Sequence, residues 1–223
     1  MTSVTVESIG VEAQPLVVLD DFGPDPDGLR RFAEAAEFTP ALNHFPGVRA
    51  ALPADYLATQ LPVIAAAAAE AFGRTGPITV VDASFSIVST PAGELTIPQR
   101  LPHIDAFTED RIALIQYLSP AGGDGTAFFR HRATGFETVD ETKRDLFFRH
   151  LDIEMRHRGV PPPEYVLGDT QLFECIRTEP ARYNRALLYR SWNLHSGAIS
   201  PDNMLSVDPA VGRLTVTGFF SIG

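Results

Sequence analysis

Cysteine is almost absent from this chain, which limits the covalent chemistry it can support. Cys175 is the one cysteine among 223 residues, so no disulfide bond can form within the chain. Such a composition is typical of proteins in a reducing compartment, and we expect a cytoplasmic location. The N-terminal stretch Met1–Gly10 lacks the basic and apolar regions of a secretory signal peptide, which agrees with that expectation.

Long apolar runs and long basic runs are also missing. The alanine-rich run at residues 65–69 is too short and too weakly apolar to cross a bilayer. The formal net charge is −10, and the basic patches at residues 130–132 and 156–158 are short. A nucleic-acid partner needs a basic surface that binds phosphates, so we expect neither a nucleic-acid nor a membrane partner.

The remaining composition is that of an ordinary globular protein. Apolar residues make up 44% of the chain and charged residues 21%. No stretch rich in proline, serine and glycine divides it into parts. We therefore expect a single domain over residues 1–223, with a large hydrophobic core.

The pattern of apolar residues predicts helices first and strands later, with one helical interruption. Helical spacing predicts helices from residue 24 to about 38 and from Pro53 to Gly73, with a break or kink at Pro62. A third helix is expected up to about Arg158, after a capping box at Thr138–Glu141. Strands are predicted at residues 16–19, 78–90, 111–118, 126–129, 165–176, 185–189 and 213–221. The fold class is therefore α+β, built on an antiparallel β core.

The strongest candidate for a functional site is the pair His103 and Asp105, in the stretch RLPHIDAF. Because they lie two residues apart on a predicted extended strand, both side chains project from the same face. A second histidine would complete a 2-His-1-carboxylate triad, which holds ferrous iron and leaves coordination positions open. His195, shortly after the predicted strand RALLY, is the best candidate for that ligand. Taken alone, the H-x-D spacing also occurs where a surface histidine lies beside a turn aspartate.

The order of features around this pair resembles that of the 2-oxoglutarate/Fe(II)-dependent oxygenases, in a prolyl-hydroxylase-like, uncharacterised bacterial branch. The features are H-x-D at His103–Asp105, the glycine-rich turn and aromatic strand GGDGTAFF, His195 in RALLYRSWNLHSG, and Arg213 on the last strand. The N-terminal PLVVLDDF followed by a helix is similar as well. The gap from His195 to Arg213 is longer than is common in such enzymes, and the helical stretch after GGDGTAFF is unusual.

The resemblance implies a double-stranded β-helix, or jelly roll, with N-terminal helices and a helical insert. It implies a catalytic centre in which His103, Asp105 and His195 bind Fe(II), with 2-oxoglutarate as co-substrate. Arg213 would grip the distal carboxylate of the co-substrate, since a guanidinium binds a carboxylate bidentately. Thr215, on the same strand face, would add a hydroxyl donor. The implied reaction is hydroxylation of a small molecule or of an amino-acid side chain, free or in a peptide.

Two other functions fit the same residues. A non-catalytic, cupin-like metal-binding or scaffold domain would keep the fold, but it would have no need of a buried Arg213. A zinc-dependent hydrolase would need a general base near the metal, and Glu109 is the nearest candidate. The sequence does not distinguish iron from another divalent metal, and it leaves the substrate and a homodimeric state open.

Several neighbours of the candidate ligands are left without a role. Tyr189 and Trp192 flank His195, and either could form a wall of the pocket. Gln116 and Tyr117 are adjacent on a predicted strand, so one of the two should face inward.

Overall fold

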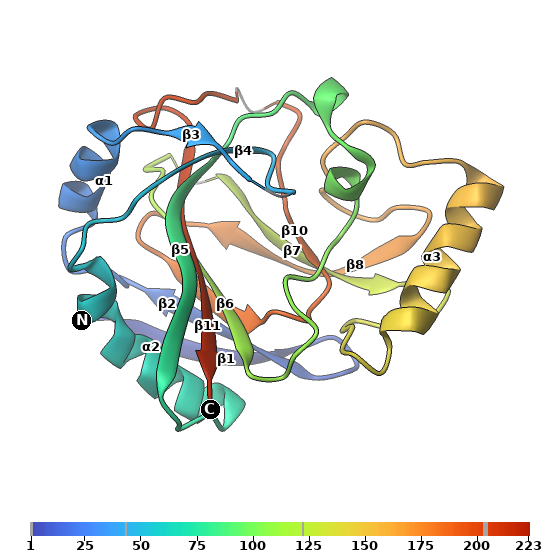
Figure 1. Cartoon of the computed structure of the whole chain (residues 1–223), viewed down its shortest axis with the longest axis horizontal. Helices are drawn as coiled ribbons and strands as arrows, with labels where there is room; N and C mark the ends of the chain where they lie inside the picture. Colours follow the sequence, from blue (N-terminus) through green and yellow to red (C-terminus); the bar gives the residue numbers. More distant parts are fainter. Residues whose placement is uncertain (1, 43, 122, 203–204) are drawn as a thin grey trace.

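The computed structural model of the chain describes residues 2–42, 44–121, 123–202 and 205–223. Within these ranges it contains two antiparallel β-sheets and three α-helices (Figure 1). This confirms a β-rich protein with few helices. Gly122, the first residue of the expected glycine-rich turn, lies outside the described residues.

The larger sheet has eight strands and carries most of the chain's backbone pairing. In spatial order they are β1 (Ser3–Ile9), β2 (Gln14–Asp20), β9 (Ala186–Arg190), β6 (Arg111–Tyr117), β11 (Arg213–Ile222), β5 (Ile78–Val88), β4 (Gly47–Ala50) and β3 (Thr39–Pro40). All neighbouring strands are antiparallel. The central strands β9 and β6 are almost wholly buried, as expected for a sheet covered on both faces, whereas the second half of β11 alternates between buried and half-buried residues.

The smaller sheet lies against one face of the larger one and has the order β10 (His195–Gly197), β7 (Gly123–His131), β8 (Phe173–Ala181). His103 adds an isolated antiparallel bridge to His195 at the free edge of β10. The smaller sheet is therefore extended by the segment that carries the H-x-D motif.

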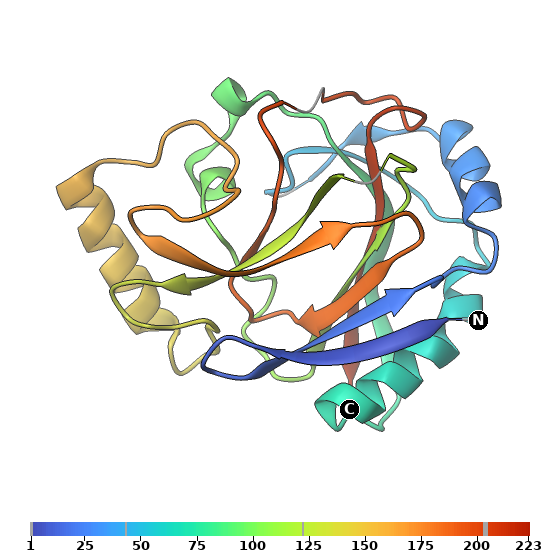
Figure 2. The same ribbon diagram turned by 180° about the vertical axis from the view of Figure 1, so that it is seen from behind.

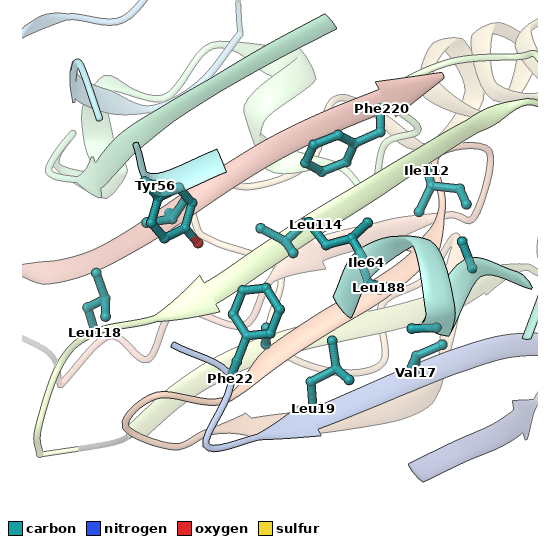
Figure 3. Close-up of a cluster of buried hydrophobic side chains, with 14 of the residues drawn as sticks. Val17, Leu19, Phe22, Tyr56, Ile64, Ile112, Leu114, Leu118, Leu188 and Phe220 are labelled. Carbon is teal, nitrogen blue, oxygen red and sulfur yellow. The ribbon is translucent and has the colours of Figure 1, made fainter. Parts of the chain in front are cut away.

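Alternating side chains on the central strands separate two apolar layers. On β6, Ile112 and Leu114 point to the side covered by α1 (Pro26–Glu34) and α2 (Tyr56–Phe72), where they pack with Phe22 and Phe220 (Figure 3). Other β6 side chains, including Tyr117, point toward the smaller sheet and pack in a cluster with Phe128 of β7 and Tyr189 of β9.

The third helix, α3 (Arg144–Arg158), covers the outer face of the smaller sheet, away from the larger one (Figures 1 and 2). Phe147 and Leu151 of α3 are buried against Phe129 and Phe173. Helices thus cover the two outer faces, and the inner faces of the two sheets enclose the space in which a site can form. No helix in the described part of the chain is long and apolar enough to cross a membrane.

Most predicted elements are present, but three details were wrong. Helix α2 runs unbroken through Pro62, because its buried face from Ile64 to Phe72 offsets the one missing hydrogen bond. The capping box at Thr138 does not form: the Thr138 hydroxyl bonds to Glu12, and Asp140 caps the turn before α3 by accepting from the Lys143 amide. Residues 165–172 are not a strand, and β8 begins only at Phe173.

Candidate metal centre

His103, Asp105 and His195 come together in the structure as the sequence predicts. One ligand atom from each lies within 4.8 Å of the others. The distance from Asp105 to His103 is 3.7 Å between Oδ1 and Nε2, and that to His195 is 3.5 Å between Oδ2 and Nε2. Ligands about 2.0–2.2 Å from one ion lie roughly 3 Å apart when they share a face of its coordination shell, so these three need only a small contraction. The donor set and its spacing therefore fit a divalent metal.

Main-chain hydrogen bonds fix the two segments that carry the ligands. The His103 amide donates to the carbonyl of His195 at 2.8 Å, and the His195 amide donates back at 2.9 Å. The Asp105 amide donates to the carbonyl of Ser191 at 2.7 Å. Asp105 itself lies in a bend, so the expected extended strand is limited to the bridge at His103. The bend still turns the carboxylate toward both imidazoles.

The orientation of His195 is set by a hydrogen bond on the far side of its ring. Nδ1 lies 2.8 Å from the carbonyl oxygen of Asn193, which can only accept, so Nδ1 carries the proton. The unprotonated Nε2 then points its lone pair at the cluster. Such a second hydrogen bond is what fixes the tautomer of metal-binding histidines.

Burial also sets the charges of the three groups. It lowers the pKa of His103 and of His195 to about 4, in the case of His103 with help from the neighbouring His195. Burial raises the pKa of Asp105 to about 6, against the opposing effects of His103 and Arg49. The His103 side chain is half exposed, because the cavity whose wall it forms is open to solvent. At neutral pH both imidazoles are therefore neutral and able to donate to a metal.

The three groups lie on the wall of a cavity of about 530 Å³ between the two sheets. Arg213, the first residue of β11, lines the same cavity. Its guanidinium donates to the carbonyls of Gly125 at 2.9 Å and of Asp124 at 3.4 Å, and it lies 5.6 Å from the centre of the Tyr117 ring. Burial lowers the pKa of Arg213, while Tyr117 and Asp124 act in the opposite direction. The cavity thus has a fixed, partly desolvated cation.

Thr215 lines the cavity as well, but its hydroxyl is already engaged. It donates to the carbonyl of Ser86 at 3.1 Å, and the residue is 1% exposed. The hydroxyl oxygen can still accept, but a donor role toward a bound anion would break the bond to Ser86.

The flanking residues divide between the cavity and the core. Tyr189 lines the cavity, with its ring 4.8 Å from that of His195, whereas Trp192 donates to Gln14 elsewhere. Neither strand neighbour reaches the cavity: Gln116 accepts from Tyr56 at 2.6 Å in the helix-side core, and Tyr117 bonds to Thr126 at 2.8 Å.

Other cavity residues were missed or undervalued by sequence reasoning. Arg49, Arg111 and Tyr165 line the cavity, as does the loop residue His44. Only Arg111 had a readable signal, because it shares the alternation of Ala113 on the strand that follows the H-x-D motif. The others reach the cavity through contacts between distant segments.

Comparison with known proteins places the chain in a family. The model of a family of unknown function, DUF6445, matches residues 1–220. The chain belongs to this family. No curated protein matches it.

Among solved structures, the neighbours are non-haem 2-oxoglutarate-dependent enzymes at low sequence identity. The carbocyclase SnoK from nogalamycin biosynthesis has a TM-score of 0.50 and 13% identity, over 93% of this chain and 79% of SnoK. The epimerase SnoN from the same biosynthesis has a TM-score of 0.47 and 11% identity, over 92% of this chain and 78% of SnoN. HygX from Streptomyces hygroscopicus, solved with nickel and 2-oxoglutarate, has a TM-score of 0.47 and 13% identity, over 94% and 84% of the two chains. The likeness to SnoK shows a shared fold, which confirms the resemblance at that level.

Proposed function

We propose that this protein is an Fe(II)- and 2-oxoglutarate-dependent oxygenase that hydroxylates a small molecule or an amino-acid side chain. The observation that carries the proposal is one cavity holding both His103–Asp105–His195 and the cation of Arg213. A metal site alone would suit a binding protein. A metal site that shares its cavity with a partly desolvated guanidinium is suited to a co-substrate that chelates metal at one end and carries a carboxylate at the other.

The strand order supports a double-stranded β-helix as the scaffold. From β5 onward the chain alternates between the two sheets. Strands β5, β6, β9 and β11 belong to the larger sheet, and the segments between them, which are His103, then β7 and β8, then β10, belong to the smaller sheet. This alternation winds the chain between two facing sheets, as a jelly roll does. In this assignment β1–β4, α1 and α2 are N-terminal additions, α3 is the helical insert, and the whole chain is one domain.

Each part of the cavity has a defined task in this mechanism. His103, Asp105 and His195 would hold the iron and leave its other positions open toward the cavity. Iron and 2-oxoglutarate, when bound, supply the oxidising chemistry that allows dioxygen to attack a C–H bond. The distal carboxylate of 2-oxoglutarate would lie against Arg213.

Tyr189 lies between the two binding points. The charges of Asp105 and Arg213 both act on the pKa of its hydroxyl, which burial raises well above the ordinary value. Its hydroxyl therefore stays protonated and can donate a hydrogen bond within the cavity. Its ring also shields one side of His195 from solvent.

Charge balance favours the same occupants. The Asp105 carboxylate and the two negative charges of 2-oxoglutarate would offset the two charges of a ferrous ion and the one of Arg213. A balanced set is far less costly to bury than any member alone. The zinc-hydrolase alternative lacks its base, because Glu109 is 63% exposed and bonds to Arg74 at 2.8 Å.

The test is metal and co-substrate binding without oxygen, followed by turnover. Parent protein should bind one Fe(II) per chain and develop a charge-transfer absorbance on addition of 2-oxoglutarate. Replacing His103, Asp105 or His195 with alanine should sharply reduce the bound iron. His157→Ala, on the exposed end of α3, is the matched control and should bind iron as the parent does.

Two outcomes would reject parts of the proposal. If all three ligand variants keep the iron content of the parent, the metal centre is wrong. If iron binds but 2-oxoglutarate gives no absorbance change and is not consumed in air, the cupin-like binding protein is the correct function.

A further inference from the structure

The cavity contains two more arginines, Arg49 and Arg111, to which the proposed reaction gives no task. They come from different strands, β4 and β6, and both line the cavity that holds the metal centre. Their position relative to the triad follows from the register of the larger sheet.

One row of paired residues marks the level of the metal centre. Asp82 lies opposite Phe219, Phe219 opposite Ala113, and Ala113 opposite Tyr189. Directly opposed residues of antiparallel strands share a face, and all four line the cavity. Because the Tyr189 ring is 4.8 Å from that of His195, this row is level with the metal centre.

Arg111 lies two residues before Ala113 and therefore on the same face, one step beyond the row. Its carbonyl accepts from the Ser191 amide at 3.0 Å, and the carbonyl of Ser191 accepts from Asp105 at 2.7 Å, so its backbone is tied to that of a proposed ligand. The Arg111 side chain has no hydrogen bond or ion pair with any residue that the structure describes. Its Nε is buried without a partner. The adjacent Asp110 carboxylate acts on Arg111 through its charge but makes no direct contact with it, and it already accepts a hydrogen bond from the Ser221 hydroxyl.

Arg49 approaches the same row from β4. Its Nη1 lies 3.1 Å from Asp82 Oδ2, and its guanidinium lies 4.9 Å from the centre of the Phe45 ring. The Arg49 Nε is also buried without a partner. Because Asp82 lies on the row that is level with the metal centre, its contact with Arg49 places the guanidinium on that side of the cavity.

Arg213 is far from Arg111 along the sheet, whereas Arg49 starts opposite Ser86, between the two, and reaches Asp82 with its side chain. Arg213 lies opposite Val88, at the start of β11, six residues before Phe219. Six residues of strand span roughly 20 Å, so Arg111 and Arg213 lie at different ends of the cavity. Beside Arg49 and Arg111 the wall carries two carboxylates, Asp82 and the proposed metal ligand Asp105, and apolar groups such as Ala113 and Phe219. Because Asp82 already engages Arg49, the unfilled hydrogen-bonding capacity at this end belongs mainly to Arg111.

We infer that the end of the cavity between Arg49 and Arg111 is the subsite for the primary substrate, and that it selects substrates with an apolar body and a carboxylate. The carboxylate binds Arg111, whose guanidinium has no hydrogen bond or ion pair with any described residue, and Arg49 adds a second positive charge to the same wall. The apolar body lies on Ala113 and Phe219, beside the metal centre. That a molecule bound in this subsite is the substrate of a reaction rests on the proposed oxygenase function. The preference of the subsite for a carboxylate does not depend on that function.

The test compares an acid with its uncharged isostere. The probes are 4-phenylbutanoate and 4-phenylbutanamide, which share one apolar body. Dissociation constants are measured by ligand-observed NMR, in metal-free protein and in protein with Fe(II) and 2-oxoglutarate without oxygen. Loss of a charge-assisted hydrogen bond weakens binding by about 10- to 100-fold, so the parent should prefer the acid by that factor.

Variants locate the preference. Arg111→Gln should bind acid and amide equally, and Arg111→Lys should keep part of the preference because it keeps the charge. Asp82→Asn should tighten acid binding, because it removes the carboxylate that competes for Arg49. Arg158→Gln, on the exposed end of α3, is the control and should behave as the parent does.

The possible outcomes separate this inference from the proposed function. Three results would overturn the inference: the parent shows no preference for the acid, the preference survives in Arg111→Gln, or it disappears in Arg213→Gln instead. A different result would reject the oxygenase function alone. In that case iron and 2-oxoglutarate do not bind, but metal-free protein still prefers the acid and Arg111→Gln loses that preference, which leaves a carboxylate-binding site at Arg111.

Discussion

Replacing Arg213 tests the proposed co-substrate site most directly. The guanidinium is held by two main-chain carbonyls, Gly125 at 2.9 Å and Asp124 at 3.4 Å. These bonds use Nη2 and Nε, which leaves Nη1 and the second hydrogen of Nη2 directed elsewhere. A carboxylate that binds there gains a charge-assisted contact with no cost for ordering the arginine, because the protein already fixes it.

The expected magnitude follows from that contact. A hydrogen bond to a charged group contributes about 1.5–3 kcal/mol, so Arg213→Ala should weaken 2-oxoglutarate binding by about 10- to 100-fold. Iron binding should be nearly unchanged, because none of the three proposed ligands bonds to Arg213. Arg213→Lys should recover part of the affinity, since it restores the charge but not the planar fork.

The assay is an anaerobic titration of the Fe(II)–2-oxoglutarate charge-transfer absorbance in the parent and both variants. Arg111→Gln is a matched control, because it removes a cation from the same cavity at the other end. Urea unfolding of each variant checks that the loss of the bond to Gly125 has not unfolded the protein. Equal 2-oxoglutarate affinities in parent and Arg213→Ala would refute the reasoning, and a loss only in Arg111→Gln would move the co-substrate to the other end.

Three further predictions concern stability and are measured by urea denaturation. The Glu137 side chain is 2% exposed and accepts hydrogen bonds from Arg130 at 2.6 Å and from the amides of the β1–β2 turn. Glu137→Gln should therefore lower the free energy of unfolding by about 3 kcal/mol, whereas the exposed control Glu164→Gln should lower it by less than about 0.5 kcal/mol. Asn184 is buried, has a φ of 60° and forms three side-chain hydrogen bonds with Gly23 and Gln116. Asn184→Ala should therefore lower the free energy of unfolding by about 3 kcal/mol, and a loss below about 1 kcal/mol would contradict the importance of these hydrogen bonds. Burial lowers the pKa of His131 below 6.5, so the unfolded state binds the proton more tightly and the free energy of unfolding should fall as the pH drops below that value. His131→Asn should make this dependence on pH less steep, by at most about 1.4 kcal/mol per pH unit. An unchanged dependence in the variant would be evidence against a role of His131.

Part of the candidate site could be predicted from the sequence because two of its residues lie in or next to strongly patterned strands. His195 follows the apolar run of β9, and Arg213 begins the alternating run of β11. Strand β1 also alternates, in the stretch Ser3–Ile9, and could have been predicted from the same rule. Where local pattern and tertiary pairing agree, single-sequence reasoning finds the element.

The cavity wall could not be predicted, because it depends on pairing between distant segments. Arg49 lies in the four-residue strand β4, opposite Ser86 of β5, and its long side chain reaches Asp82 further along that strand. His44 and Tyr165 reach the cavity from segments without a period. Thr215 was assigned by its strand face, yet its hydroxyl is used by Ser86, a contact that no local pattern contains.

The glycine-rich motif shows how one short segment can serve both folding and binding. Its glycines suggested a turn, but Gly123 and Gly125 lie within β7, where the pairing with β8 shifts register between Gly123 and Thr126. A Cβ on Gly125 would lie 1.8 Å from the carbonyl oxygen of Glu179, so only glycine allows the two strands to approach this closely. The Gly125 carbonyl accepts from the Ala198 amide at 3.1 Å and also from the guanidinium of Arg213. The residue that lets the smaller sheet form therefore also positions the proposed co-substrate cation, which explains why a glycine lies in a strand at this point.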